Sequence, residues 1–214
     1  MAKPLLVIGN KTYSSWSLRG WLALKLAEIE FHEMVLPLDT PTFTEEIGRL
    51  SPSRQVPALR FGDWVLHDSL AILEWAAEQD PRLWPADPKH RAVARAVTAE
   101  MHSGFAALRQ ACPMNLRRAP NPIDLDGEAR NDAQRVAQIW QDGLEARGGP
   151  FLFGSEPGGA DSFYAPMATR FHTYGLPAGP TATRYVETIM NWALMQSWIE
   201  DARAETAVLA REER

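Results

Sequence analysis

The sequence has a single cysteine, Cys112, among its 214 residues. One thiol excludes an internal disulfide framework and a redox-active cysteine pair. Cys112 lies in "LRQACPMN", where a small core side chain is the expected role. The histidines show none of the spacings that are typical of metal ligands, so we expect no metal site; they are His32, His67, His90, His102 and His172.

Long apolar runs and clusters of one charge are also missing. No uninterrupted run approaches the roughly 18 apolar residues that span a bilayer, and the opening "MAKPLLVIGNK" is too short for a secretion signal. The formal net charge is only -5, and no cluster of Lys and Arg resembles a nucleic-acid footprint. We therefore expect a cytoplasmic globular protein with neither a membrane nor a nucleic-acid partner.

The first 80 residues predict an α/β unit. Hydrophobic periodicity indicates a strand, a helix and a second strand, and after a loop or helix it indicates a hairpin about Gly62-Asp63 and a further helix. The ranges are 5–8, 18–26, 31–38, 56–67 and 68–79.

Beyond this unit the strand signals disappear. Three prolines in "DPRLWPADP" make the best linker candidate, because proline breaks helices. Periodic apolar residues then predict helices over 89–111, 128–147, 161–174, 182–194 and 197–210. We expect two domains, residues 1–80 and an all-helical unit of residues 89–214, joined by the linker 81–88.

Two helix starts in the α/β unit are candidate anion sites. Ser14 and Ser15 stand where the chain leaves the first strand, and Asp68 and Ser69 open the last helix of the unit. Unpaired backbone N–H groups at a helix start favour an anion. The alternative interpretation is that these side chains are ordinary helix caps.

The segment "QVPAL" is a third candidate. Pro57 directly precedes a strand and cannot donate a ladder hydrogen bond, so Val56 is free to present its backbone to a ligand. A cis Val56-Pro57 bond would favour that geometry, but only about 5–6% of such bonds are cis. The sequence therefore leaves the isomer open.

At this order and spacing the segments resemble those of the glutathione transferases. "SSWSLRGWLAL", "SPSRQVPAL" and "DSLAILEW" are similar to the three glutathione-site segments of that superfamily, and "GGADSFYAP" resembles the start of a helix in its second domain. The serine-containing "SSWS" and "SRQVP" are most similar to the zeta class. The resemblance implies a thioredoxin-like glutathione-binding domain, an all-α domain that contributes the electrophile site, glutathione as co-substrate and a homodimer.

Roles for individual residues follow from the resemblance. It implies that Ser14, or its neighbour Ser15, hydrogen-bonds the glutathione thiolate and so lowers the thiol pKa. Tyr13 is a further candidate, because tyrosine is the donor in other classes. The peptide itself would be bound by Gln55, Val56, Pro57, Asp68 and Ser69.

The second substrate is expected between the domains, along the helix after the linker. Met101 and Phe105, four residues apart in "AEMHSGFAALRQ", form a candidate wall for an apolar electrophile. The leading hypothesis is conjugation of glutathione to a small hydrophobic electrophile. The alternatives are glutathione-dependent cis-trans isomerisation, as in maleylacetoacetate isomerase, and ligand binding without turnover.

Overall fold

The structure is a computed structural model that describes residues 3–213. Its N-terminal half contains a four-stranded mixed sheet in the order β2-β1-β3-β4. The first strand runs parallel to β2 and antiparallel to β3, which pairs antiparallel with β4. The strands are β1 (Leu5–Ile8), β2 (His32–Val35), β3 (Ala58–Phe61) and β4 (Trp64–His67).

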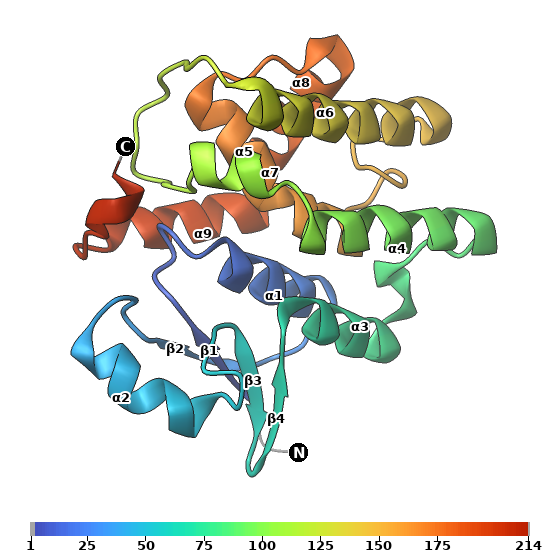
Figure 1. Ribbon diagram of the computed structural model, residues 1–214. Coiled ribbons are helices and arrows are strands. Elements are labelled where there is room, and N and C mark those ends of the chain that lie inside the picture. The colour runs from blue at the N-terminus through green and yellow to red at the C-terminus, as the bar shows by residue number, and fades with distance from the viewer. Residues whose placement is uncertain (1–2, 214) are drawn as a thin grey trace.

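Helices cover both faces of this sheet, as the alternation of side chains in β1 requires. Leu6 and Ile8 pack in the main hydrophobic core with α1 (Ser15–Leu26) and α3 (Ser69–Gln79). Val7 points to the opposite face, where it packs beside Ile47 of α2 (Pro41–Leu50). Figure 1 shows α2 on one side of the sheet and α1 with α3 on the other.

The second half is helical and lies against α1 (Figure 1). The main core runs without interruption from β1 through α1 into α7, so the two halves share one hydrophobic interior. The elements are η1 (Pro81–Leu83), α4 (Pro88–Ser103), α5 (Ala106–Ala111), α6 (Gly127–Arg147), α7 (Gly159–Tyr174), α8 (Gly179–Asn191), α9 (Ala193–Ala204) and η2 (Ala210–Glu212).

The predicted fold class is confirmed, but one predicted helix is two. In place of a single helix over 89–111, α4 ends at Ser103 and α5 starts after Phe105, whose φ of 61° is left-handed. Gly104 stands at the break, where a Cβ would lie 2.7 Å from the carbonyl oxygen of Glu100. Periodicity continues across the break because Met101, Phe105 and Leu108 are all buried.

Smaller differences concern element ends. The strand predicted over 31–38 ends at Val35, because Leu36 N–H makes a last bond to Ile8 and Pro37 has no N–H to donate. The segment before the hairpin, for which the sequence allowed either a loop or a helix, forms α2. This helix is capped by Thr40, whose hydroxyl accepts from Phe43 N–H at 3.1 Å. The last two long helices begin three and four residues earlier than predicted, at Gly179 and Ala193.

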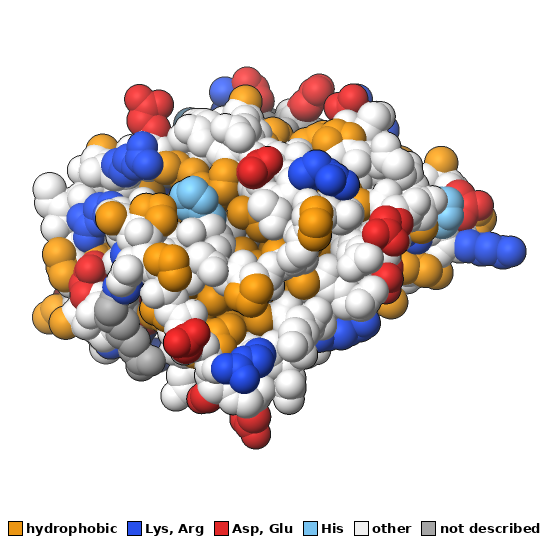
Figure 2. Space-filling view, turned by 90° about the horizontal axis from the view of Figure 1, so that it is seen from above, with side chains coloured by type: hydrophobic (Ala, Val, Ile, Leu, Met, Phe, Trp, Pro, Cys, Tyr) orange, Lys and Arg blue, Asp and Glu red, His pale blue; other side chains and the backbone are white. Residues whose placement is uncertain are grey.

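The surface shows no field of one sign on the helical face seen in Figure 2, where acidic and basic side chains are interspersed with apolar ones. Within residues 3–213, no helix is both long and apolar enough to cross a membrane. The same part of the chain contains no group of three or more His, Cys, Asp or Glu side chains arranged to hold a metal ion.

Candidate functional site

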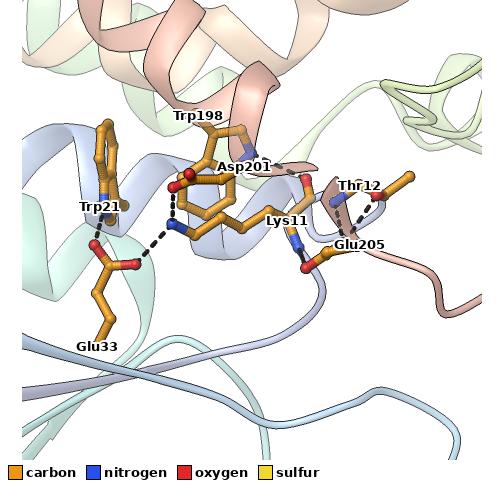
Figure 3. Close-up of polar contacts among 7 residues, drawn as sticks. All are labelled: Lys11, Thr12, Trp21, Glu33, Trp198, Asp201 and Glu205. Atoms are coloured by element: carbon orange, nitrogen blue, oxygen red, sulfur yellow. Dashed lines mark hydrogen bonds and ion pairs between the residues drawn. The ribbon is translucent and has the colours of Figure 1, made fainter. Parts of the chain in front are cut away.

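The loop between β1 and α1 is fixed by a buried lysine (Figure 3). Lys11 Nζ lies 2.8 Å from Glu33 and 2.6 Å from Asp201 of α9. It also stands 5.0 Å from the ring centroid of Trp198, within the range of a cation–π contact. Burial acts to lower the pKa of Lys11, but the hydrogen bonds and charges of Asp201 and Glu33 raise it above its ordinary value. The charged lysine therefore ties the loop to the last helix.

Glu205, directly after α9, holds the same loop through its backbone (Figure 3). Its carboxylate accepts from Lys11 N–H at 2.7 Å and from Thr12 N–H at 3.0 Å. The Thr12 hydroxyl lies within donating distance of the same group, at 2.8 Å, and of the Ala202 carbonyl, at 2.9 Å. Two residues before Ser14, the chain is thus oriented by the C-terminal part of the protein.

Ser14 caps α1, as the alternative interpretation of the serines predicts. Its Oγ accepts from Ser17 N–H at 3.3 Å and donates to Ser17 Oγ at 2.8 Å. Gly9 N–H in turn donates to Ser17 Oγ at 3.0 Å. Ser17 is fully buried, and the sequence reasoning assigned it no role. The signal that could have identified Ser17 is its position: it is a third hydroxyl residue at this helix start, three residues after the cap.

Ser15 and Tyr13 differ in how their hydroxyls are used. The Ser15 hydroxyl makes no hydrogen bond within residues 3–213, although the residue is only 8% exposed. The Tyr13 hydroxyl donates to Glu213 and accepts from Arg117 at 2.7 Å. Burial and the bond to Glu213 raise the pKa of Tyr13. The phenol is therefore already occupied by the C-terminal segment.

The Val56-Pro57 bond is cis. Pro57 packs beneath α1, where a Cβ on Gly20 would lie 3.1 Å from its Cγ. Val56 lies just before β3, and no backbone hydrogen bond joins it to another part of the described chain. Its N–H and carbonyl are therefore available to a ligand, and Gln55 beside it is exposed.

The start of α3 is the third part of the site. Asp68, at a φ of 80°, accepts from Leu70 N–H at 2.7 Å through one oxygen. Its other oxygen faces His102 Nε2 of α4 at 3.4 Å. The Ser69 hydroxyl is buried and has no hydrogen-bond partner among the described residues. An unsatisfied buried hydroxyl at a helix start suits a bound carboxylate.

All three segments line one cavity of about 770 Å³. Eight of the ten predicted site residues border it: Tyr13, Ser14, Ser15, Gln55, Val56, Pro57, Asp68 and Ser69. Met101 and Phe105 do not; their side chains are buried in the core at 0% and 7% exposure. Sequence periodicity placed them on the buried face of α4 and α5, and that face points into the protein rather than into the cavity.

The helical half contributes other residues to the wall. These are His102, Arg109, Pro113, Met114 and Arg170, joined by Leu209, Arg211 and Glu212 of the C-terminal segment. A second hollow of about 830 Å³ lies along η1 and the start of α7. It contains none of the predicted site residues, so its larger volume does not make it the better candidate.

Trp16 connects the glutathione-type segment to the helical wall. The guanidinium of Arg19 lies 4.5 Å from the centroid of its ring, and that of Arg109 lies 4.7 Å away. His102 meets the same ring edge-on at 5.3 Å. Arg19 is only 1% exposed, so its guanidinium is buried beside this ring.

Two family descriptions match the chain. The N-terminal domain of glutathione S-transferase matches residues 13–79, and the C-terminal domain matches residues 91–200. Maleylacetoacetate isomerase of Mus musculus is 30% identical over 188 residues, which is 85% of this chain and 84% of the relative. A zeta-class glutathione S-transferase of Euphorbia esula is 28% identical, over 79% of each chain. The chain belongs to the glutathione S-transferase family, and its similarities are zeta-like.

Solved structures share the fold. A glutathione transferase homologue from Burkholderia, with bound glutathione, superposes with a TM-score of 0.72 at 24% identity, covering 95% of this chain and all of the other. Maleylacetoacetate isomerase from Anaeromyxobacter dehalogenans, with glutathione in its active site, gives a TM-score of 0.66 at 24% identity and covers 96% of this chain and 98% of the other. At this identity the likeness concerns the fold.

Proposed function

We propose that the protein is a glutathione-dependent enzyme in which a serine hydroxyl stabilises the glutathione thiolate for attack on an electrophilic carbon. The observation that carries this proposal is the convergence of the three predicted segments on one cavity. Family membership supports it, and so do the relatives and neighbours named for glutathione chemistry.

The peptide would lie across the thioredoxin-like half. Val56 would pair through its free backbone groups with the cysteinyl unit, and Gln55 would approach the glycyl end. At the start of α3 the unsatisfied Ser69 hydroxyl would donate to the γ-glutamyl carboxylate, while Asp68 would accept from the γ-glutamyl amine. These positions place the thiol toward the start of α1, where the backbone N–H groups and the helix dipole favour a negative charge.

Ser14 would be the principal thiol donor, through a short chain of hydroxyls. Ser17 already accepts from Gly9 N–H, so rotation of its own hydroxyl lets it donate to Ser14 Oγ. Ser14 then turns its proton from Ser17 to the thiolate. Ser15, whose hydroxyl has no partner within residues 3–213, would add a second donor. Hydrogen bonds to the charged form lower a thiol pKa below about 8.5.

The experiment is a pH titration of bound glutathione, followed by the ultraviolet absorbance of the thiolate. In Ser14→Ala we expect the thiol pKa to rise by about one unit, since one charge-assisted bond of about 1.5 kcal/mol is lost. Glutathione affinity, measured by calorimetry, should change little. Tyr13→Phe is the matched control, because its hydroxyl is held by Glu213 and Arg117.

The outcomes separate the hypotheses. If wild type binds glutathione without lowering its thiol pKa, the ligand-binding alternative replaces the enzyme. If Tyr13→Phe raises the thiol pKa and Ser14→Ala does not, the serine assignment is wrong. If wild type does not bind glutathione at all, only the fold is shared with the family.

Conjugation and isomerisation share the first step, addition of the thiolate to the electrophile. They differ in whether the adduct leaves or breaks down again to release glutathione. The relatives named maleylacetoacetate isomerase favour the second course as much as the transferases favour the first. Counting glutathione consumed per product formed decides between them: one per turnover for conjugation and none for isomerisation.

A further inference from the structure

A histidine of the helical half reaches the start of α3. His102, in the last turn of α4, places its Nε2 3.4 Å from Oδ2 of Asp68. The other oxygen of Asp68 already accepts from Leu70 N–H at 2.7 Å, so Oδ2 is the oxygen that remains for a ligand. Both side chains border the cavity of about 770 Å³. The imidazole therefore stands beside the carboxylate oxygen that a bound ammonium group would use.

The packing of the imidazole favours its neutral form. Its Nδ1 is buried and has no hydrogen-bond partner among residues 3–213, so a doubly protonated ring would carry an N–H there without an acceptor. The ring lies edge-on to Trp16 at 5.3 Å and stands 6.1 Å from the ring of Phe163 in α7. These two rings hold the imidazole with Nε2 toward Asp68.

The charged groups that face His102 come from three elements. They are Asp68 at the start of α3, Arg19 of α1 and Arg109 of α5, whereas α7 presents the apolar ring of Phe163. Burial lowers the pKa of His102; the charge of Asp68 opposes this, and those of Arg19 and Arg109 add to it, so the net pKa is below its ordinary value of 6.5. The imidazole is therefore largely neutral at pH 7 and takes up a proton in mildly acidic solution.

We propose that His102 is a positioning residue for glutathione, which acts through Asp68. As a neutral imidazole it leaves Asp68 Oδ2 to the γ-glutamyl ammonium group, and as an imidazolium it takes that oxygen itself. This inference rests on the proposed function, because that function puts the γ-glutamyl amine at Asp68. Two cations that share one carboxylate oxygen repel each other, so the co-substrate binds with release of the histidine proton to the solvent.

The proposal sets the sign of the pH dependence. Below its pKa His102 is charged and loses a proton before the ammonium group binds, so glutathione affinity falls as the pH drops below 6.5, the ordinary pKa of histidine. The fall ends where the pH is also below the pKa of His102 in the complex. Each unit by which the bound ammonium lowers that pKa weakens binding tenfold in acid.

The experiment measures the affinity of S-methylglutathione by calorimetry on the full-length protein at about pH 5 and pH 7. The methyl group removes the thiol from the titration, and the amine stays protonated, since α-amino groups titrate near 7.7–8.0. We expect wild type to bind at least about threefold more weakly at the lower pH. Near pH 6 the heat of binding should vary with the ionisation enthalpy of the buffer, which reports the released proton.

His102→Gln keeps a polar group that reaches toward Asp68 but does not titrate. It should bind S-methylglutathione as wild type does at pH 7 and lose most of the pH dependence. His90→Gln is the matched control, because His90 is an exposed histidine of α4 that faces Asp87 at 3.8 Å and does not border the cavity. This variant should keep the pH dependence of wild type.

A second control changes the ligand in place of the protein. S-methylated glutaryl-cysteinylglycine has the carboxylates of glutathione but no amine. Its affinity for wild type should not fall in acid, because it brings no cation to compete with the imidazolium. This comparison needs no variant, so a folding defect in His102→Gln, detected by circular dichroism and urea unfolding, leaves the inference testable.

Three results overturn the inference. Wild-type affinity for S-methylglutathione is equal at the two pH values; or a folded His102→Gln keeps the full loss in acid, which assigns the titration to another group; or the amine-free analogue shows the same loss as S-methylglutathione. If S-methylglutathione fails to bind wild type at pH 7, the proposed function fails and this inference with it. Binding that is intact but independent of pH contradicts this inference alone.

Discussion

Glu205→Ala tests how the C-terminal segment positions the site. This carboxylate accepts from Lys11 N–H, Thr12 N–H and the Thr12 hydroxyl, at 2.7, 3.0 and 2.8 Å, and the hydroxyl can also donate to the Ala202 carbonyl at 2.9 Å. Hydrogen bonds to a charged group contribute about 1.5–3 kcal/mol each when their loss leaves a buried donor unpaired. Thr12 is fully buried and Lys11 is 7% exposed, whereas Glu205 itself is half-buried, so water replaces part of the loss.

We therefore expect Glu205→Ala to lower the free energy of unfolding by about 2–3 kcal/mol, less than the sum of three full bonds. Glu205→Gln keeps one acceptor oxygen but offers an NH₂ group to the second backbone donor, so about half of that loss should remain. The loop leads directly to Ser14, and a looser loop should also weaken glutathione binding by several-fold.

Urea unfolding followed by circular dichroism gives the stability, and calorimetry gives the glutathione affinity. Glu200→Ala is the matched control, because Glu200 is an exposed glutamate of α9, five residues before Glu205, and a surface change of this kind is expected to stay within about 0.5 kcal/mol. The reasoning is refuted if Glu205→Ala is as stable as Glu200→Ala, since the carboxylate would then contribute nothing that water does not supply.

Two further predictions concern the helical half. Asp161 accepts from Leu152 N–H, Gly158 N–H and the Tyr185 hydroxyl, yet burial raises its pKa to about 6. The folded protein therefore holds a proton that the unfolded chain releases between about pH 4 and 6, so stability should fall by up to about 3 kcal/mol as the pH rises through this range and then level off. Urea unfolding at each pH should show this fall in wild type and not in Asp161→Asn; an equal fall in both would contradict it. Gly104→Ala, measured at neutral pH, should cost about 1–3 kcal/mol because its Cβ meets the carbonyl of an α4 residue 2.7 Å away; an unchanged midpoint would show that the break moves freely.

The parts of the site that follow from local sequence were predictable. Helix starts at Ser14 and Asp68, and a proline before the strand at Pro57, are read from neighbouring residues. Their convergence required the resemblance to a known family, because it depends on contacts between residues about 40 to 55 positions apart. The cis isomer at Pro57 stayed open for the same reason, since tertiary packing against Gly20 accompanies it.

The helical wall was not predictable from periodicity. Met101 and Phe105 share an apolar stripe, and a stripe marks the face that is buried, not the face that meets a ligand. Residues that line the cavity, such as Arg109, interrupt the stripe and resemble ordinary surface charges in the sequence. Only the break at Gly104 turns α5 so that Arg109 reaches back to the end of α4 and Trp16.

The same break determines where the Arg109 guanidinium lies. An uninterrupted helix would satisfy the carbonyls of Met101 and His102 with backbone N–H groups, and Arg109 would have no reason to bend toward them. Because the helix stops at Ser103, those carbonyls need donors, and a guanidinium supplies one while remaining charged. The helix end thus holds the Arg109 guanidinium at the wall of the cavity.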